Sequence, residues 1–141
     1  MRENPRIEGG RWLEQAQIDL GWCRHLHSQG AHYLVCFLAQ QVAEKALKAF
    51  LYAQGEELVV GHSVRQLCAR AATYDARFQL SLSRWGILDS YYIPTRYPNG
   101  LPDDIPAHVY NHETANNAVG LAGEVVTAVE AWFTSPESRQ P

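Results

Sequence analysis

A narrow polar stripe interrupts the most apolar segment of the sequence, YLVCFLAQQVAEKALKAFLYA. Four side chains in this stripe could do chemistry: Gln41, Glu44, Lys45 and Lys48. Their spacing of three and four residues places them on one face of a helix, which Tyr52 continues. Two lysines one turn apart can hold a phosphate, and the glutamine and glutamate can orient them. The alternative is a solvated face on a helix that is otherwise buried.

A second group of candidates lies in the segment YYIPTRYP, where Tyr92, Arg96 and Tyr97 stand among prolines. An arginine can bind phosphate through two parallel hydrogen bonds, and a tyrosine can stack on a base. Rigid proline flanks lower the entropy cost of ordering the loop when a ligand binds. The alternative is a surface loop whose tyrosines cover the ends of helices.

Histidines are the third kind of candidate. His62 precedes a predicted helix and could transfer a proton or contact a phosphate, or it could simply close the loop. His108 is a weaker catalytic candidate. His108 and His112 are four residues apart but lack the further ligands that a zinc site needs. His25 and His27 point about 200° apart on a helix and cannot share a ligand. We therefore expect no metal site and no cofactor.

Helical periodicity accounts for most of the chain. It predicts helices over residues 9–28, 32–54 and 112–133, a shorter helix capped by Ser63, and another over 78–93. The second helix is apolar around most of its circumference, which indicates a central position. Glycines end the first two helices, so these should pair as an antiparallel hairpin. We find no repeat and no convincing strand.

The segment before the last helix carries a proline at every fourth position from 94 to 106 and predicts an extended or turning loop. We therefore expect one domain over residues 10–133, between an N-terminal tail (1–9) and a frayed C-terminal tail (134–141). The predicted fold is all-α: an up-and-down bundle of about five helices, with two long antiparallel helices and a proline-rich loop before the last one.

Composition excludes several classes of protein. The 141 residues are 46% hydrophobic and 19% charged with a net charge of −3, which argues against disorder and against a basic nucleic-acid coat protein. No apolar run is long enough for a membrane span. Cys23, Cys36 and Cys68 have no CxxC spacing and indicate buried thiols in a reducing compartment, so we expect a cytoplasmic protein. Sequences typical of a nucleophile elbow, a P-loop or a dinucleotide fold are absent.

Taken in order, the segments AQQVAEKALKAFL, GHSVRQL, YYIPTRYP and ETANNAV resemble the HEPN domain (higher eukaryotes and prokaryotes nucleotide-binding). The resemblance covers residues 10–133, and TRYP followed by IP is similar to the HEPN domain of the chaperone-related protein sacsin. It implies a helical bundle that is commonly a homodimer, with a nucleotide such as ATP or GTP, or RNA, as ligand. The matching positions are Gln41, Glu44, Lys45, Lys48, His62, Tyr92, Arg96 and Tyr97.

The resemblance leaves the activity open. HEPN ribonucleases carry an arginine followed, after four to six residues, by a histidine, and no pair here has that spacing. We therefore expect binding, with Lys45, Lys48 and Arg96 holding a phosphate, rather than catalysis. One alternative is a metal-independent ribonuclease that uses Arg96 with His62 or His108. Others are a toxin–antitoxin partner of a separately encoded nucleotidyltransferase, as many prokaryotic HEPN domains are, and a chaperone-associated interaction domain.

Overall fold

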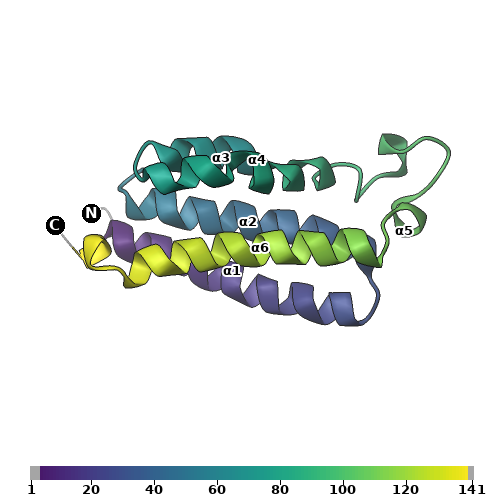
Figure 1. The fold of residues 1–141 in the computed structure, drawn as a ribbon, viewed down its shortest axis with the longest axis horizontal. Helices are drawn as coiled ribbons and strands as arrows, with labels where there is room; N and C mark the ends of the chain where they lie inside the picture. Colours follow the sequence, from purple (N-terminus) through teal and green to yellow (C-terminus); the bar gives the residue numbers. More distant parts are fainter. Residues whose placement is uncertain (1–3, 140–141) are drawn as a thin grey trace.

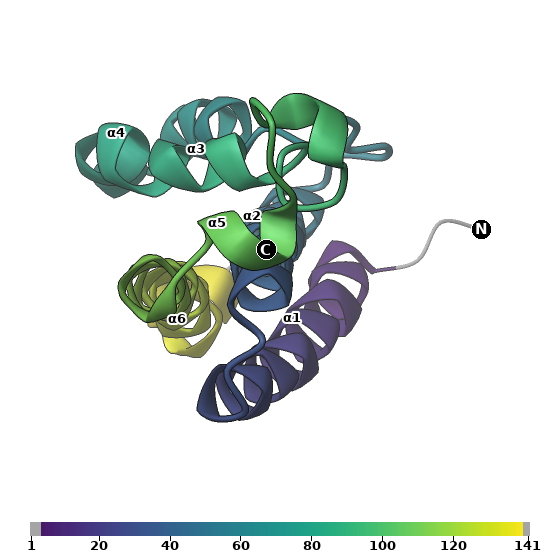
Figure 2. The same ribbon diagram turned by 90° about the vertical axis from the view of Figure 1, so that its right-hand side faces the viewer.

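Three long helices lie side by side in the computed structural model, which describes residues 4–139 (Figure 1). They are α1 (Pro5–Ser28), α2 (His32–Ala53) and α6 (His112–Thr134). Viewed along its length, the molecule has α2 in the middle, with α1 and α6 on one side and the segment around α3 (Val64–Ala72) on the other (Figure 2). No strand occurs within residues 4–139, and the predicted all-α bundle is confirmed.

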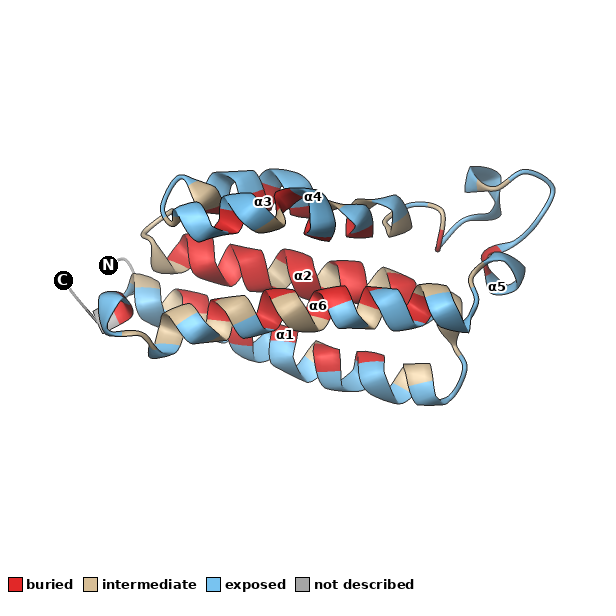
Figure 3. Cartoon of the chain, in the orientation of Figure 1, coloured by how far each residue is buried: buried red, intermediate tan, exposed pale blue. Residues whose placement is uncertain are grey.

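The central position predicted for the second helix is confirmed by burial. Fourteen of the 18 residues of α2 from Val35 to Tyr52 are buried. In contrast, α1 and α6 each expose one face (Figure 3). Because α2 contacts α1, α3 and α6, apolar side chains around most of its circumference leave water. Among the described residues, no helix combines the length and the apolar character that crossing a membrane requires.

Capping residues determine where the helices begin. Asn111 and Ser63 accept hydrogen bonds from the backbone N–H groups of Thr114 (2.9 Å) and Gln66 (3.1 Å), as the sequence predicts. The predicted start of the first helix is wrong. Asn4 accepts a bond from the N–H of Arg6, and Pro5 occupies the first helical position, so residues 5–9 form the first turns of α1 instead of a tail.

The helix predicted over 78–93 is broken into short pieces. They are η1 (Ala76–Ser81), α4 (Leu82–Trp85) and η2 (Gly86–Tyr91). Gly86 lies where this segment crosses α3, and a Cβ added there would sit 3.0 Å from the Cβ of Arg65. The close approach explains why glycine occupies a position where it lowers helix propensity.

The proline-rich segment is more helical than predicted. It contains two single turns, η3 (Pro98–Gly100) and α5 (Pro106–Val109), each of which begins with a proline. The C-terminal end is also more ordered than predicted, because η4 (Pro136–Arg139) folds back and the buried Ser138 hydroxyl donates to the carbonyl of Phe133 (3.0 Å). Residues 1–3 and 140–141 of the predicted tails lie outside the described residues.

Candidate functional site

The polar stripe on α2 is largely covered, so the alternative of a solvated face is wrong. Glu44, Lys48 and Tyr52 are buried, because Trp12 of α1 covers this side of the helix. The ring of Trp12 stacks on that of Tyr52 at 5.2 Å, and the Lys48 ammonium lies 5.8 Å from the Trp12 ring. Lys48 Nζ pairs with Glu44 Oε2 at 3.2 Å. The stripe therefore holds a shielded ion pair rather than two free lysines.

The second oxygen of Glu44 reaches His62, which the sequence proposed as a separate candidate. His62 Nδ1 lies 3.1 Å from Glu44 Oε1. Because an ionised carboxylate can only accept, Nδ1 carries the hydrogen, and Nε2 has a lone pair whenever the ring is neutral. The His62 side chain is 61% exposed, and its Nε2 has no hydrogen-bond partner within residues 4–139. A buried carboxylate thus orients an imidazole whose basic nitrogen is open to solvent.

Two glutamines hold the backbone of His62. Gln40, which is fully buried, donates from Nε2 to the carbonyl of His62 at 2.7 Å. Gln41 donates in turn to Gln40 Oε1 at 2.6 Å. Gln41, a predicted ligand-binding residue, supports Gln40, which is not among the candidates in the sequence.

Asp89 fixes the same loop from the other side. Its carboxylate accepts from the Ser63 hydroxyl (2.8 Å) and from the backbone N–H groups of Val64 (2.6 Å) and Arg65 (3.1 Å). A carboxylate at a helix N-terminus satisfies free N–H groups and interacts favourably with the helix dipole. Asp89 therefore ties the start of α3 and the adjoining His62 to η2. It is far from Ser63 in the sequence, and no local signal could have revealed the contact.

Tyr92 connects His62 with Arg96. The rings of His62 and Tyr92 stack at 5.1 Å with an interplanar angle of 17°. The Arg96 guanidinium lies 4.5 Å from the Tyr92 ring, 4.9 Å from that of Phe37 and 5.3 Å from that of Tyr97. Arg96 Nε donates to the Tyr92 carbonyl at 2.8 Å. We call Glu44, His62, Tyr92, Arg96 and Tyr97 the His62 site.

The predicted three-cation cluster does not form at one point. Lys45 is half-buried and pairs with Asp19 of α1 at 2.5 Å, beside a shallow hollow of about 430 Å³. Phe37, against which Arg96 lies, precedes Lys48 by eleven residues, or about 16 Å along a helix. Only Arg96 among the three lysine and arginine candidates is exposed without an acidic partner within residues 4–139.

Comparison with known proteins identifies the fold. Residues 10–132 match the model of the HEPN domain. The chain belongs to the HEPN family. A similar solved structure is TT1696 from Thermus thermophilus, with 34% identity, a TM-score of 0.77, and coverage of 88% of this chain and 97% of that one. Another is ST0689, an archaeal HEPN homologue, with 30% identity, a TM-score of 0.68, and coverage of 90% and 98%. No curated protein matches the chain.

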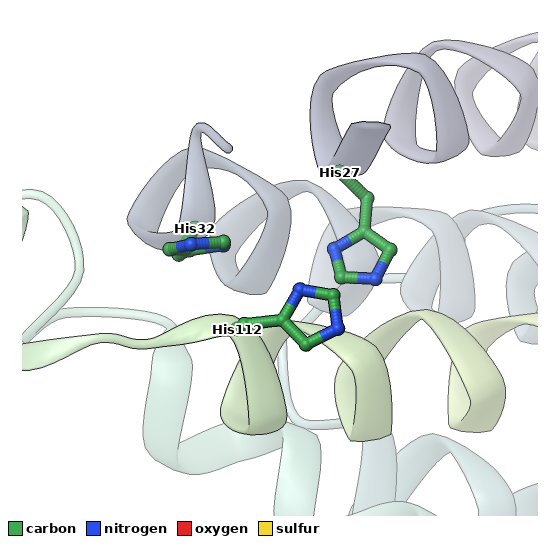
Figure 4. A group of neighbouring side chains, drawn as sticks. All are labelled: His27, His32 and His112. Carbon is green, nitrogen blue, oxygen red and sulfur yellow. The ribbon is translucent and has the colours of Figure 1, made fainter. Parts of the chain in front are cut away.

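Within this HEPN domain, His108 stands apart from the His62 site. Its Nδ1 lies 3.0 Å from Asp104 on the exposed proline-rich segment, and no contact joins it to His62 or Arg96 among the described residues. Neither pair considered for metal binding, His25 with His27 or His108 with His112, is found in a group of three potential metal ligands within residues 4–139. The HEPN topology instead brings His27, His32 and His112 together (Figure 4). Sequence spacing could not reveal this, although all three flank turns at one end of the bundle.

The cysteines of the domain are free and buried, which confirms the sequence-based interpretation of their burial. Burial raises the pKa of Cys23 and of Cys36 to about 12, and that of Cys68 to about 11, because it disfavours the thiolate. All three are therefore neutral thiols near neutral pH and behave as small apolar side chains rather than as nucleophiles.

Proposed function

We propose that this HEPN domain binds a nucleotide or the end of an RNA chain at the His62 site. The observation that carries the proposal is the arrangement of Arg96. Its guanidinium is exposed and lies over three aromatic rings, and neither terminal nitrogen has a hydrogen-bond partner within residues 4–139. A guanidinium has a planar set of donors that matches the geometry of a phosphate.

The aromatic neighbours of Arg96 supply the second half of such a site. Tyr97 is 51% exposed and offers a ring face on which a base can stack. The stacking of Arg96 on Tyr92 and its bond to the Tyr92 carbonyl restrain the side chain before a ligand arrives, which lowers the entropy cost of binding. With a net charge of −3, the chain has no general attraction for nucleic acid, so recognition depends on this local group.

Arg96→Ala should weaken nucleotide binding about tenfold to a hundredfold, as expected for the loss of charge-assisted hydrogen bonds. Isothermal titration calorimetry with GTP and with ATP measures this change. Arg24→Ala is the matched control, because Arg24 is an exposed arginine on α1 without an ion pair among the described residues. Arg96→Lys keeps the charge but loses the planar donor set, and we expect intermediate affinity. The absence of binding to the wild-type protein at millimolar nucleotide would contradict the proposal.

RNA cleavage is a second candidate, which the Glu44–His62 pair favours. A carboxylate that holds Nδ1–H leaves Nε2 available to accept a proton from a ribose 2′-hydroxyl, and Arg96 could stabilise the phosphate that develops charge. This arrangement needs no metal. HEPN ribonucleases use an arginine and a histidine that lie close together in the sequence. Here the same chemistry would be performed by Arg96 and His62, which are far apart in the sequence.

His62→Ala should then lower the rate of RNA cleavage about a hundredfold or more, in keeping with the loss of a general base. The assay uses a fluorescent oligoribonucleotide in the presence of EDTA. His108→Ala is the control, because His108 is 68% exposed, against 61% for His62, but lies outside the His62 site. If the RNA is unchanged after long incubation with the wild-type protein, cleavage is excluded and only the binding proposal remains. If the cleavage rate falls equally in His62→Ala and His108→Ala, His62 is not the specific base.

The homodimer, the toxin–antitoxin role with a separately encoded nucleotidyltransferase, the chaperone association of the sacsin-like branch and the cytoplasmic location stay predictions. Sedimentation velocity on the purified protein tests the dimer. Genes adjacent to the one that encodes this chain test the nucleotidyltransferase partner, because toxin–antitoxin partners are encoded side by side. Neither result decides whether the His62 site binds a nucleotide, so each is an independent test.

A further inference from the structure

Three histidines meet at the end of the bundle that lies away from the chain termini. His27 belongs to the last turn of α1, His32 is the first residue of α2, and His112 is the first residue of α6. One ring nitrogen from each lies within 4.8 Å of those of the other two. Figure 4 shows the imidazole of His112 beside that of His27, with His32 approaching from the adjacent helix. Residues from three helix ends thus converge on one small space.

Two of the ring nitrogens in this group are shielded from solvent and have no partner. They are Nδ1 of His27 and Nδ1 of His32. A polar nitrogen that is buried without a hydrogen bond costs free energy, and such atoms in folded proteins usually bind water or an ion. The unpaired nitrogens are therefore an observation about this cluster that is independent of the proximity of the three rings.

Asn116 determines which nitrogen of His27 can donate electrons. His27 Nε2 lies 3.2 Å from Asn116 Oδ1, which is an acceptor, so Nε2 carries the hydrogen and Nδ1 keeps its lone pair. Histidines that bind metals characteristically donate their other ring N–H to an oxygen in this way. His32 and His112 make no side-chain hydrogen bond within residues 4–139, so either can present a lone pair to the same point.

The donor set selects the class of ion. Imidazole nitrogens suit Zn²⁺, Cu²⁺ and Ni²⁺, whereas Mg²⁺ and Ca²⁺ prefer oxygen ligands. The group contains no carboxylate. Cys23, four residues before His27 on α1, donates its thiol hydrogen to the Val35 carbonyl and has a pKa of about 12, because burial disfavours its thiolate. Three imidazoles leave one position of a tetrahedral ion open to water.

Metal binding requires a small closure of the site. Zn–N bonds of 2.0–2.1 Å place tetrahedral ligand nitrogens about 3.4 Å apart, which is closer than the limit of 4.8 Å in the present arrangement. His112 is exposed and can supply most of this movement by rotating its side chain, since the ring is stacked on His27 at 4.8 Å without a hydrogen bond. The negative end of the α1 dipole lies at His27 and favours a cation, whereas the positive ends of α2 and α6 oppose it.

We propose that His27, His32 and His112 form a binding site for one divalent transition-metal ion of the zinc class, with the fourth position occupied by water. The ion joins the ends of α1, α2 and α6. The first residues of α2 and α6, His32 and His112, are 80 residues apart in the sequence. Because only the folded protein brings the three ligands together, binding stabilises the fold. The site shares no residue with the His62 site and is independent of the proposed function.

His112→Ala should weaken Zn²⁺ binding by about tenfold to a hundredfold or more, because two imidazoles remain. The probe is Zn²⁺ titrated by calorimetry into the 141-residue chain, which carries no affinity tag and has been stripped with a chelator. We expect one ion per chain in the wild type and no heat with Mg²⁺. His108→Ala is the matched control, since it removes an exposed histidine four residues earlier in the sequence and should leave Zn²⁺ binding unchanged.

A thermal measurement separates the site from surface binding. Zn²⁺ at a hundredfold excess over its dissociation constant should raise the Tm of the wild type by about 5–10 °C, and should leave that of His112→Ala nearly unchanged. Because His112 is exposed, this variant should fold, and circular dichroism checks that it does. The proposal is overturned if the wild type binds no Zn²⁺, or if His112→Ala and His108→Ala bind it equally.

Discussion

Replacing Gly9 with alanine should lower the free energy of unfolding by about 2–4 kcal/mol. Gly9 is buried where α1 crosses the end of α2, and a Cβ there would lie 2.4 Å from the carbonyl oxygen of Ala49 and 2.9 Å from Cβ of Ala53. The first of these atoms belongs to the backbone of the central helix and cannot move aside. The two helices must separate, which opens the packing between them. Urea denaturation followed by circular dichroism measures the change.

Two other glycines of α1 provide the control for this prediction. A Cβ at Gly10 or Gly21 would meet no atom within 4 Å. Alanine has the higher helix propensity, so each of these replacements should stabilise the protein by about 0.5–1 kcal/mol. If the unfolding free energy falls for Gly9→Ala but rises for the other two variants, the effect at Gly9 is due to packing rather than to helix propensity. A Gly9→Ala protein as stable as Gly10→Ala would contradict the packing of α1 on α2 described above.

Glu44→Ala should destabilise the protein by about 3 kcal/mol or more, because it leaves the Lys48 ammonium buried without its partner. The side chains of Glu44 and Lys48 are only 7% and 8% exposed, and Trp12 covers the lysine. Removing one member of a buried pair costs more than the pair contributes, since the remaining charge has lost both water and its counter-ion. The same denaturation experiment measures this effect.

Two further variants distinguish the cause. Glu44→Leu combined with Lys48→Met removes both charges and should restore stability to within about 1 kcal/mol of the wild type. Asp19→Asn breaks the Lys45 pair between the same two helices, but the 28% exposure of Lys45 leaves it access to water, so we expect a loss below about 1 kcal/mol. If the double variant is as unstable as Glu44→Ala, the shape of Glu44 matters rather than the unpaired charge.

The helices could be predicted because their signals are local. Asn111 and Ser63 cap helices whose first free N–H groups lie within three residues, so sequence order already places donor and acceptor together. Asn4 followed by Pro5 carries the same signal, although the predicted boundary assigns both residues to a tail. Gly86 is a recognisable weak point of the helix predicted over 78–93. The reason that glycine is needed there, the close approach of Arg65, could not be predicted because Arg65 belongs to another helix, α3.

The candidate site could be predicted in its members but not in its arrangement. His62, Tyr92 and Arg96 are separate candidates in the sequence, and the structure joins them through stacking, whereas Lys45 and Lys48 are paired with Asp19 and Glu44. A polar stripe has the same periodicity whether water or Trp12 covers it. Because burial depends on what packs against a face, the sequence pattern could not distinguish an exposed lysine from a buried ion pair.

The sequence by itself determined the helical class, the central position of α2 and the absence of a long apolar span, because periodicity and composition depend only on the order of residues. Only the tertiary structure decided which distant side chains meet. It placed the Glu44 carboxylate between Lys48 and His62, set Arg96 over Tyr92, and brought His27, His32 and His112 to one end of the bundle. The physical reason is that such contacts are formed by helix packing, which brings together residues that sequence spacing keeps apart.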